Sequence, residues 1–220
     1  MRFSAILWDC DGCLIDSEWI ACGIGAEMLT ELGYPITTQE FVFRFCGQSK
    51  SHIYGSIQSE TGIDYLPMLA AADKKTRQRE AFLKDLKAIC GIEDVLDSIA
   101  VPMAIASGSA MDRLEYTLQL TDLYRRFDGR IYNSEMVARG KPAPDVFLYA
   151  AAQLGVAPEK CLVIEDSHNG VRSGKAAGMT VFGFTGGKHI LDKEKHATEL
   201  TDLGADVVFH NMSELPRLML

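Results

Sequence analysis

Two aspartates, Asp9 and Asp11, stand two positions apart near the start of the chain, and Gly12 follows them. They come directly after the apolar run Ala5–Trp8, which predicts a β-strand. Ligands of an open α/β sheet bind beyond the carboxyl ends of its strands, so the two carboxylates can converge on one ligand. Three interpretations follow: a polar loop closed by a turn glycine, a calcium loop, or a nucleophile and an acid/base group beside a magnesium ion. An EF-hand calcium loop is excluded because apolar residues occupy its glycine and final glutamate positions.

Three further segments place polar groups at the end of a predicted strand or the start of a predicted helix. Ser107 and Gly108 follow an apolar run, where a hydroxyl and backbone N–H groups can hold phosphate oxygens. Lys141 stands between a glycine and a proline and can act as a point charge for phosphate. Glu165 and Asp166 end the most apolar run, and such a carboxylate pair suits Mg²⁺. Each segment alone is consistent with an ordinary turn or cap, but all four in this order are not.

Short apolar runs predict the strands that must position these residues. The six runs are Ala5–Trp8, Met103–Ala106, Arg130–Tyr132, Leu162–Ile164, Thr180–Phe184 and Asp206–Phe209. Helical patterns follow several of them: Asp145–Leu154 is expected to end at Gly155, and Ser109 is expected to open a helix through a capping box. This alternation predicts an α/β fold with a Rossmann-like parallel sheet and helices on both faces.

Residues 16–88 interrupt the alternation, because they carry helical patterns and almost no strand signal. Two apolar stripes run through this region, formed by Ile20, Ile24, Met28 and Leu32 and by Phe82, Leu83, Leu86 and Ile89. Stripes of this kind are typical of a helical core. The simplest interpretation is a helical domain of residues 16–88 inserted into an α/β core domain of residues 1–15 and 89–220.

The composition limits the class of protein. The 220 residues carry 22 Lys+Arg and 30 Asp+Glu, a formal charge of −8, and 47% of them are hydrophobic. This composition excludes a disordered chain, and the acidic balance disfavours nucleic acid and membrane surfaces as partners. No apolar run approaches the ~20 residues that span a bilayer, and an early aspartate interrupts the N-terminal apolar run, so neither a membrane span nor a signal peptide is predicted. We expect a reduced, cytoplasmic monomer.

The chain resembles the haloacid dehalogenase-like (HAD) hydrolase superfamily in all four of its motifs, which are Asp9-x-Asp11-Gly12, Ser107, Lys141 and Glu165-Asp166. The resemblance covers essentially the whole chain, and the helical insertion is similar to the cap domain of that family. The tracts Gly140–Phe147 and Val163–Gly178 resemble the branch that contains small sugar-phosphate phosphatases and β-phosphoglucomutase.

The resemblance implies a role for each acidic residue. Asp9 would attack phosphorus and form an aspartyl-phosphate, and Asp11 would protonate the leaving oxygen and then take a proton from water. Mg²⁺ would be held by the carboxylate of Asp9, the backbone carbonyl of Asp11 and Asp166, with Glu165 nearby.

The resemblance also implies the substrate contacts. Ser107 with neighbouring N–H groups such as that of Gly108, together with Lys141, would bind the transferring phosphoryl oxygens. In this branch the cap supplies a specificity loop, and Arg44–Lys50 occupies the corresponding place. Lys50 is the candidate for a distal anionic group of the substrate, although a lysine on a solvated helix explains it equally well. The expected partner is a small phosphorylated metabolite.

Residue differences from other members of the superfamily limit the reactions that this chain is expected to catalyse. Dehalogenases of the superfamily lack an aspartate like Asp11 and its ion pumps carry threonine there, so this chain resembles a phosphatase or a phosphomutase. β-Phosphoglucomutase has a histidine in the first cap helix, whereas Trp19–Cys22 contains none, which favours hydrolysis. A sugar or sugar-acid phosphate is the first expectation for the substrate, with phosphoglycolate or a mutase reaction as alternatives.

Cysteine and histidine chemistry offers competing interpretations. Cys10 and Cys13 form a C-x-x-C pair, but the neighbouring carboxylates should raise their pKa values and reduce their reactivity. A disulfide between them that silences the enzyme stays a weaker hypothesis. The other cysteines are scattered and predict no zinc site: Cys22, Cys46, Cys90 and Cys161. The five histidines show no metal-ligand spacing. A non-catalytic binding protein is disfavoured because the nucleophile and lysine positions are both filled.

Overall fold

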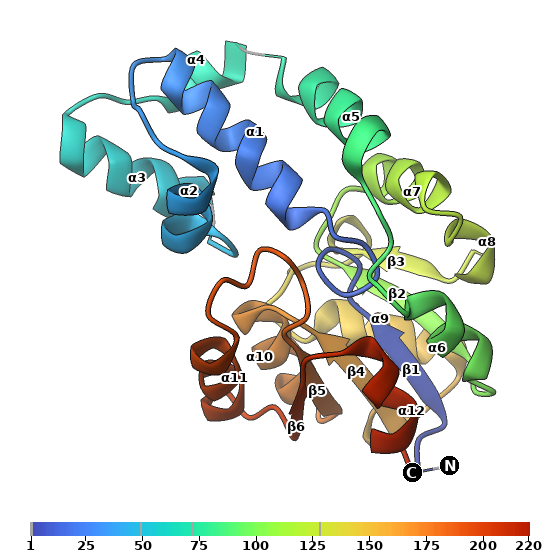
Figure 1. Ribbon diagram of the computed structural model, residues 1–220. Helices are drawn as coiled ribbons and strands as arrows, with labels where there is room; N and C mark the ends of the chain where they lie inside the picture. The colour runs from blue at the N-terminus through green and yellow to red at the C-terminus, as the bar shows by residue number, and fades with distance from the viewer. Residues whose placement is uncertain (1, 49, 72, 128) are drawn as a thin grey trace. The chain divides into compact units, whose positions relative to one another are not determined.

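The computed structural model describes residues 2–48, 50–71, 73–127 and 129–220 (Figure 1). The chain divides into two compact units. The larger unit consists of Met1–Asp16 with Lys87–Leu220, and the smaller one of Ser17–Leu86.

A six-stranded, fully parallel sheet forms the centre of the larger unit, in the order β3-β2-β1-β4-β5-β6. The strands are β1 (Ala5–Trp8), β2 (Met103–Ser107), β3 (Ile131–Asn133), β4 (Cys161–Glu165), β5 (Thr180–Phe184) and β6 (Val207–Phe209). All six predicted strands are present, and the predicted α/β fold with a Rossmann-like sheet is confirmed. The chain moves outward in one direction from β1 to β3 and in the other from β4 to β6. The loops after β1 and β4 therefore leave the sheet at a topological switch point, where such folds bind ligands.

Both faces of this sheet are buried, which explains why its strands are apolar runs and do not alternate with polar residues. In β1, Leu7 pairs with Ala104 on one side and with Val163 on the other. Leu7 and Val163 share one core cluster with Phe147 and Val171 from helices on that face. Trp8 points to the opposite face and is also fully buried.

Helices cover the sheet on both sides. α9 (Asp145–Leu154) packs on β1, β2 and β3, and α10 (His168–Ala176) packs on β4 and β5. In Figure 1, α6 (Ile92–Ser98) and α12 (Leu215–Leu218) lie on the opposite face from α9 and α10. The remaining helices of this unit are α7 (Met111–Leu120), α8 (Tyr124–Phe127) and α11 (Lys193–Asp202), with 3₁₀ turns at Ser134–Met136, Pro158–Lys160 and Met212–Glu214.

One predicted helix end is confirmed and one predicted helix start is wrong. Gly155 ends α9 in the left-handed conformation, with φ of 66°. The capping box expected at Ser109 does not form: α7 begins at Met111 and Ala110 is its N-cap residue, without a side-chain cap. The hydroxyl of Ser109 instead bonds to a carboxylate of the site described below.

Helices are the regular secondary structure of the described part of the smaller unit, and turns and loops connect them. They are α1 (Glu18–Glu31), α2 (Thr38–Phe45), α3 (Lys50–Thr61), α4 (Leu66–Ala71) and α5 (Lys74–Asp85), and α1 packs against both α2 and α5. A capping box with both of its hydrogen bonds starts α2. The hydroxyl of Thr37 accepts from the N–H of Glu40, and the N–H of Thr37 donates to the Glu40 carboxylate. The core of this unit includes Ala26, Leu29 and Phe41.

The second predicted apolar stripe is only partly correct. Phe82 is buried, but Leu83 is 69% exposed, because consecutive residues of a helix lie 100° apart and cannot share one narrow face. Ile89 is buried in the larger unit, beyond the end of α5.

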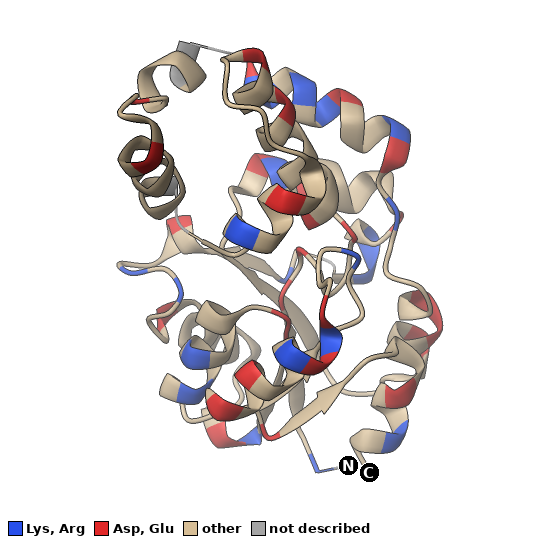
Figure 2. Cartoon of the chain, turned by 60° about the vertical axis from the view of Figure 1, so that its left-hand side comes forward, with Lys and Arg blue, Asp and Glu red and all other residues tan. Residues whose placement is uncertain are grey.

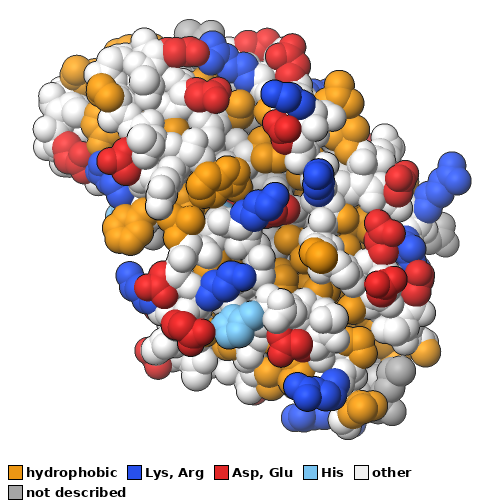
Figure 3. Space-filling view, viewed as in Figure 1, with side chains coloured by type: hydrophobic (Ala, Val, Ile, Leu, Met, Phe, Trp, Pro, Cys, Tyr) orange, Lys and Arg blue, Asp and Glu red, His pale blue; other side chains and the backbone are white. Residues whose placement is uncertain are grey.

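Charged side chains of both signs are mixed along the chain. Figure 2 shows lysine, arginine, aspartate and glutamate positions interspersed on the helices, and Figure 3 shows the same mixing on one face of the molecule. Within the described ranges, no helix combines the length and hydropathy that a membrane crossing requires.

The contact of α10 with the sheet depends on Gly174. A Cβ atom at Gly174 would lie 2.7 Å from Cγ2 of the buried Val181, whereas a Cβ at Gly55 of α3 would meet nothing within 4 Å. Overpacking a dense core costs about 1–3 kcal/mol, so Gly174→Ala should lower the free energy of unfolding by about that amount. The matched Gly55→Ala should leave it unchanged or raise it by up to ~1 kcal/mol, from helix propensity. Urea unfolding followed by circular dichroism measures both, and equal effects would contradict this account of the contact.

Candidate active site

A lysine lies between two carboxylates at the carboxyl edge of the sheet. The Nζ atom of Lys141 is 2.6 Å from Oδ1 of Asp9, the first residue after β1, and 2.5 Å from Oε1 of Glu165, the last residue of β4. Glu165 is fully buried and the side chain of Lys141 is 8% exposed. Three charges are therefore held together with little contact with solvent, where unpaired charges would be costly.

The environment shifts the pKa values of this group in opposing ways. Burial raises the pKa of Asp9 well above its ordinary value, and the Lys141 ammonium opposes that shift. Burial would lower the pKa of Lys141, but Asp9 and Glu165 outweigh it and raise the pKa above its ordinary value. Lys141 is therefore a permanent positive charge beside the nucleophile candidate.

The loop that carries Lys141 is fixed at several points. A turn forms within it, where the N–H of Ala143 donates to the carbonyl of Gly140 at 3.0 Å. Ser173 of α10 donates its hydroxyl to the carbonyl of Ala143 at 2.6 Å. The Lys141 ammonium lies 4.7 Å from the ring centroid of Phe147, a cation–π contact. These contacts from α9, α10 and the loop itself add to the ion pair with Glu165 of β4 in positioning the lysine.

Glu165 is paired at both of its oxygens. One oxygen contacts Lys141, and the other accepts from the N–H and the hydroxyl of Ser167 at 2.9 and 3.0 Å. Ser167 is also the N-cap of α10 and accepts from the N–H of Gly170. A Cβ atom at Gly170 would lie 1.7 Å from Oε1 of Glu165, so the close approach of α10 requires glycine there.

Asp166 lies beside Asp9 in a set of side chains that fits a metal ion. The carboxylate oxygens of Asp9 and Asp166 and the sulfur of Cys13 lie within 4.8 Å of one another, and all three residues are buried. Burial first, and then the neighbouring carboxylates, raise the pKa of Cys13 well above its ordinary value. The carboxylate oxygens of Asp9 and Asp166 are donors that suit Mg²⁺.

Gly12 makes room for the carboxylate of Asp166. It has φ of +85°, and a Cβ atom there would lie 1.8 Å from Oδ2 of Asp166. The same oxygen is 3.0 Å from Nε2 of His189, and the backbone carbonyl of Asp166 is 2.6 Å from Nε2 of His196. Sequence reasoning missed both histidines, which come from segments after β5 and show no local motif.

A second group of potential metal ligands lies next to Asp166. His168, His196 and Glu199 bring their ligand atoms within 4.8 Å of one another, and the two imidazole rings are 5.1 Å apart between centroids. Spacing along the sequence does not indicate this group, because residues distant in sequence meet where α11 packs beside α10.

Asp11 is held by two residues that sequence reasoning did not identify as part of the site. Ser109 donates its hydroxyl to Oδ2 of Asp11 at 2.5 Å, and Nη2 of Arg113 lies 2.7 Å from Oδ1. Ser109 is itself anchored, since its carbonyl accepts from Asn133 at 3.0 Å. In the sequence, Ser109 and Arg113 lie four residues apart around the start of the helix after β2, which does not indicate Asp11 as their partner.

The predicted substrate-binding residues occupy two different units. Ser107 is buried at the end of β2, where its hydroxyl oxygen accepts from the N–H of Ser109 at 3.1 Å, and the carbonyl of Gly108 accepts from Ser134. Lys50 is the first residue of α3 in the smaller unit, so it is not among the residues that the larger unit brings together, and its role stays a prediction.

Comparison with known proteins identifies the family. Residues 6–184 match the haloacid dehalogenase-like hydrolase family, so the chain belongs to that family. It is an enzyme of the phosphoric monoester hydrolase class.

Particular relatives match over nearly the full length. The chain is 28% identical over 217 residues to a 6-phosphogluconate phosphatase from Escherichia coli, covering 99% of this chain and 95% of that protein. A haloacid dehalogenase-like protein of unknown function from Agrobacterium tumefaciens has 38% identity and a TM-score of 0.90, covering 99% and 97% of the two chains. A family hydrolase from Deinococcus radiodurans, solved with phosphate and sodium, has 33% identity and a TM-score of 0.83, covering 99% and 95%.

The thiols beside the two aspartates should be unreactive. Cys10 and Cys13 are fully buried, and burial followed by the adjacent carboxylates raises the pKa of each well above its ordinary value. Because the thiolate is the reactive form, iodoacetamide at neutral pH should modify the exposed Cys90 and leave both unmodified until the chain is unfolded. Peptide mass spectrometry of native and urea-unfolded samples measures this. Rapid native labelling of Cys10 or Cys13 would contradict it and would favour the disulfide hypothesis.

Proposed function

We propose that this protein is a Mg²⁺-dependent phosphatase that hydrolyses a small sugar phosphate or sugar-acid phosphate through an aspartyl-phosphate. The observation that carries the proposal is the buried group in which Lys141 joins Asp9 to Glu165, with Asp166 beside it. In this proposal, that group of side chains supplies a nucleophile, a fixed cation and a set of metal-binding oxygens at the switch point of the sheet.

Asp9 is proposed as the nucleophile. One of its oxygens contacts Lys141, which offsets part of the cost of keeping the buried carboxylate ionised. The ionised carboxylate would attack phosphorus in line with the leaving oxygen, forming an acyl phosphate that water then hydrolyses. Lys141 would at the same time attract the phosphoryl oxygens, because its charge does not depend on pH in the physiological range.

Asp11 is proposed as the general acid and base. Ser109 and Arg113 hold its two oxygens, so its carboxylate has a defined direction. It would give a proton to the leaving sugar oxygen in the first half of the reaction and take one from water in the second. Positioning of this kind is a large part of catalysis in phosphoryl transfer.

The carboxylates of Asp9 and Asp166 would hold Mg²⁺, with the backbone carbonyl of Asp11 as a further ligand by the family resemblance. When bound there, the ion supplies positive charge to the phosphoryl group. Ser107 and the N–H groups around Gly108 would bind the remaining phosphoryl oxygens. An acidic protein thus needs no basic surface to hold an anionic substrate.

The proposed substrate class is based on the activity named for a relative and on the expected role of the smaller unit as a cap. The E. coli relative is named a 6-phosphogluconate phosphatase, which supports a sugar-acid phosphate as substrate. Residues 17–86 would serve as the cap that excludes bulk water and selects the substrate, with Lys50 as a contact for a second anionic group.

Removing the nucleophile should remove the activity. With MgCl₂, the chain should release phosphate from members of a panel containing 6-phosphogluconate, fructose 1-phosphate, phosphoglycolate and β-glucose 1-phosphate. Asp9→Asn should lower kcat by at least ~10³-fold, because no other group can form the acyl phosphate. Asp202→Asn, at an exposed position of α11, is the matched control and should retain full activity.

Several outcomes of this experiment decide against the proposal. Near-wild-type turnover by Asp9→Asn would exclude the aspartyl-phosphate, and activity that survives EDTA would exclude the magnesium requirement. Conversion of β-glucose 1-phosphate to glucose 6-phosphate faster than phosphate release would establish the phosphomutase alternative.

Loss of the groups that hold Asp11 should affect kcat selectively. Arg113→Met and Ser109→Ala each remove one contact to the carboxylate of Asp11, and misplacement of an acid/base group by about 1 Å costs up to ~100-fold in rate. We expect kcat to fall by about 10–100-fold with little change in KM. Arg125→Met, at an exposed position of α8, is the matched control. A rise in KM at constant kcat would show that Arg113 binds substrate and does not position Asp11.

A further inference from the structure

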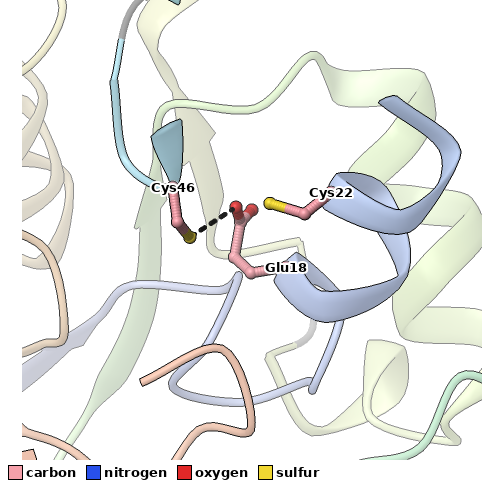
Figure 4. Close-up of side chains that lie close together, drawn as sticks. All are labelled: Glu18, Cys22 and Cys46. Atoms are coloured by element: carbon pink, nitrogen blue, oxygen red, sulfur yellow. Dashed lines mark hydrogen bonds between the residues drawn. The ribbon is translucent and has the colours of Figure 1, made fainter. Parts of the chain in front are cut away.

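Two cysteines and a glutamate of the smaller unit converge on one point, and none of them is among the residues of the proposed phosphatase site. The sulfurs of Cys22 and Cys46 and a carboxylate oxygen of Glu18 lie within 4.8 Å of one another. Figure 4 shows the Glu18 carboxylate between the two sulfurs. The sequence expectation that the scattered cysteines form no zinc site is therefore open to revision, because Cys22 and Cys46 meet in the folded chain.

The three donors come from well-packed elements. Glu18 and Cys22 lie four residues apart on α1, so they share one face of the helix, one turn apart. Cys22 is 6% exposed and belongs to the core cluster of this unit, and Cys46 packs against that cluster. Such ligands lose little conformational freedom when they bind an ion.

Cys46 is held by the backbone at the end of α2. Its N–H donates to the carbonyl of Val42 at 3.1 Å, and the N–H of Gln48 donates to the carbonyl of Phe45 at 3.1 Å. Gly47 follows with φ of +74°, which turns the chain away from the helix. The sulfur of Cys46 is thereby directed to Oε2 of Glu18, 3.9 Å away, as a weak S–H donor.

We infer that Glu18, Cys22 and Cys46 form a binding site for a thiophilic divalent cation of the Zn²⁺ class. Two thiolates and one carboxylate are the donor types that Zn²⁺ accepts, whereas Mg²⁺ and Ca²⁺ require oxygen ligands. Three protein ligands leave a fourth tetrahedral position for water or another ligand.

The spacing of the donors is compatible with this ion. Zn–S and Zn–O bonds of about 2.3 and 2.1 Å place tetrahedral ligands roughly 3.6–3.8 Å apart. The present separations reach at most 4.8 Å, so modest side-chain rotation closes the site. The ion would replace the thiol protons and neutralise two of the three negative charges that its ligands then carry.

Binding would fasten the first turn of α1 to the end of α2. Cys46, at that junction, lies within the Arg44–Lys50 segment in which the substrate-selecting loop is expected. A disulfide between Cys22 and Cys46 is the competing chemistry for the same sulfurs, and it would require the Glu18 carboxylate to leave its place between them.

Cobalt and zinc titrations of the full-length, phosphine-reduced protein test the site. Adding CoCl₂ should produce a thiolate-to-cobalt charge-transfer band, and ZnCl₂ should displace the cobalt and abolish the band. The His168, His196 and Glu199 group contains no sulfur and cannot produce this signal, and the Cys13→Ser variant separates it from a band formed at Asp9 and Asp166. Zn²⁺ should also raise Tm, because it binds the folded chain.

Single variants locate the signal. Cys46→Ser and Cys22→Ser should each lose the band and the zinc-dependent rise in Tm, and Glu18→Gln should weaken zinc binding. Cys13→Ser, beside Asp9 and Asp166, and Cys90→Ser, at an exposed position, are the matched controls and should retain both signals. Because Cys22 is buried, the half-buried Cys46 and Glu18 provide variants that keep the test decisive if Cys22→Ser does not fold.

Three results would overturn the inference. One is a charge-transfer band that survives Cys46→Ser, and another is a band that disappears in Cys13→Ser. The third is the absence of any band in the reduced wild-type protein, with a Cys22–Cys46 disulfide detected by mass spectrometry in the unreduced one. None of these measurements depends on phosphatase turnover. A failure of the metal site is therefore distinguishable from a failure of the proposed function.

Discussion

The arrangement of the site depends on the two ion pairs that the ammonium of Lys141 forms with the carboxylates of Asp9 and Glu165. Two buried carboxylates at the ends of adjacent strands would repel each other and lose hydration, and one buried cation offsets both costs. The lysine reaches this position because its loop is fastened to α10 through Ser173 and its ammonium packs on Phe147 of α9. The two helices on one face of the sheet thus determine the charge state at its edge.

Two glycines allow the backbone to come close to the carboxylates of the site. Gly12 and Gly170 each occupy a place where a Cβ atom would overlap a carboxylate oxygen, of Asp166 and Glu165 respectively. The carboxylates could not converge if either position carried a side chain. This explains why the acidic motifs of the chain come with glycines at fixed offsets, and why the site is dense in charge yet nearly closed to solvent.

Much of the fold could be read from local patterns. Both faces of the parallel sheet are buried, so each strand is a short apolar run that is visible in the sequence, and all six were predicted. Two errors have different causes. A tertiary contact overrode a local signal at Ser109, which has the sequence context of a cap residue but donates to Asp11. Leu83 faces solvent because it lies 100° around the helix from the buried Phe82. The insertion at residues 16–88 and the role of Lys50 stay predictions.

The sequence by itself determined the residue types of the site and their order, because Asp9, Asp11, Lys141, Glu165 and Asp166 each follow or precede an element whose pattern is local. Only the tertiary structure decided what those residues contact. Ser109 and Arg113 lie 98 and 102 positions from Asp11 and reach it because β1 and β2 are neighbours in the sheet. Cys22 and Cys46 meet because α1 packs against α2. Contacts of this kind depend on how elements pack, and no spacing along the chain encodes them.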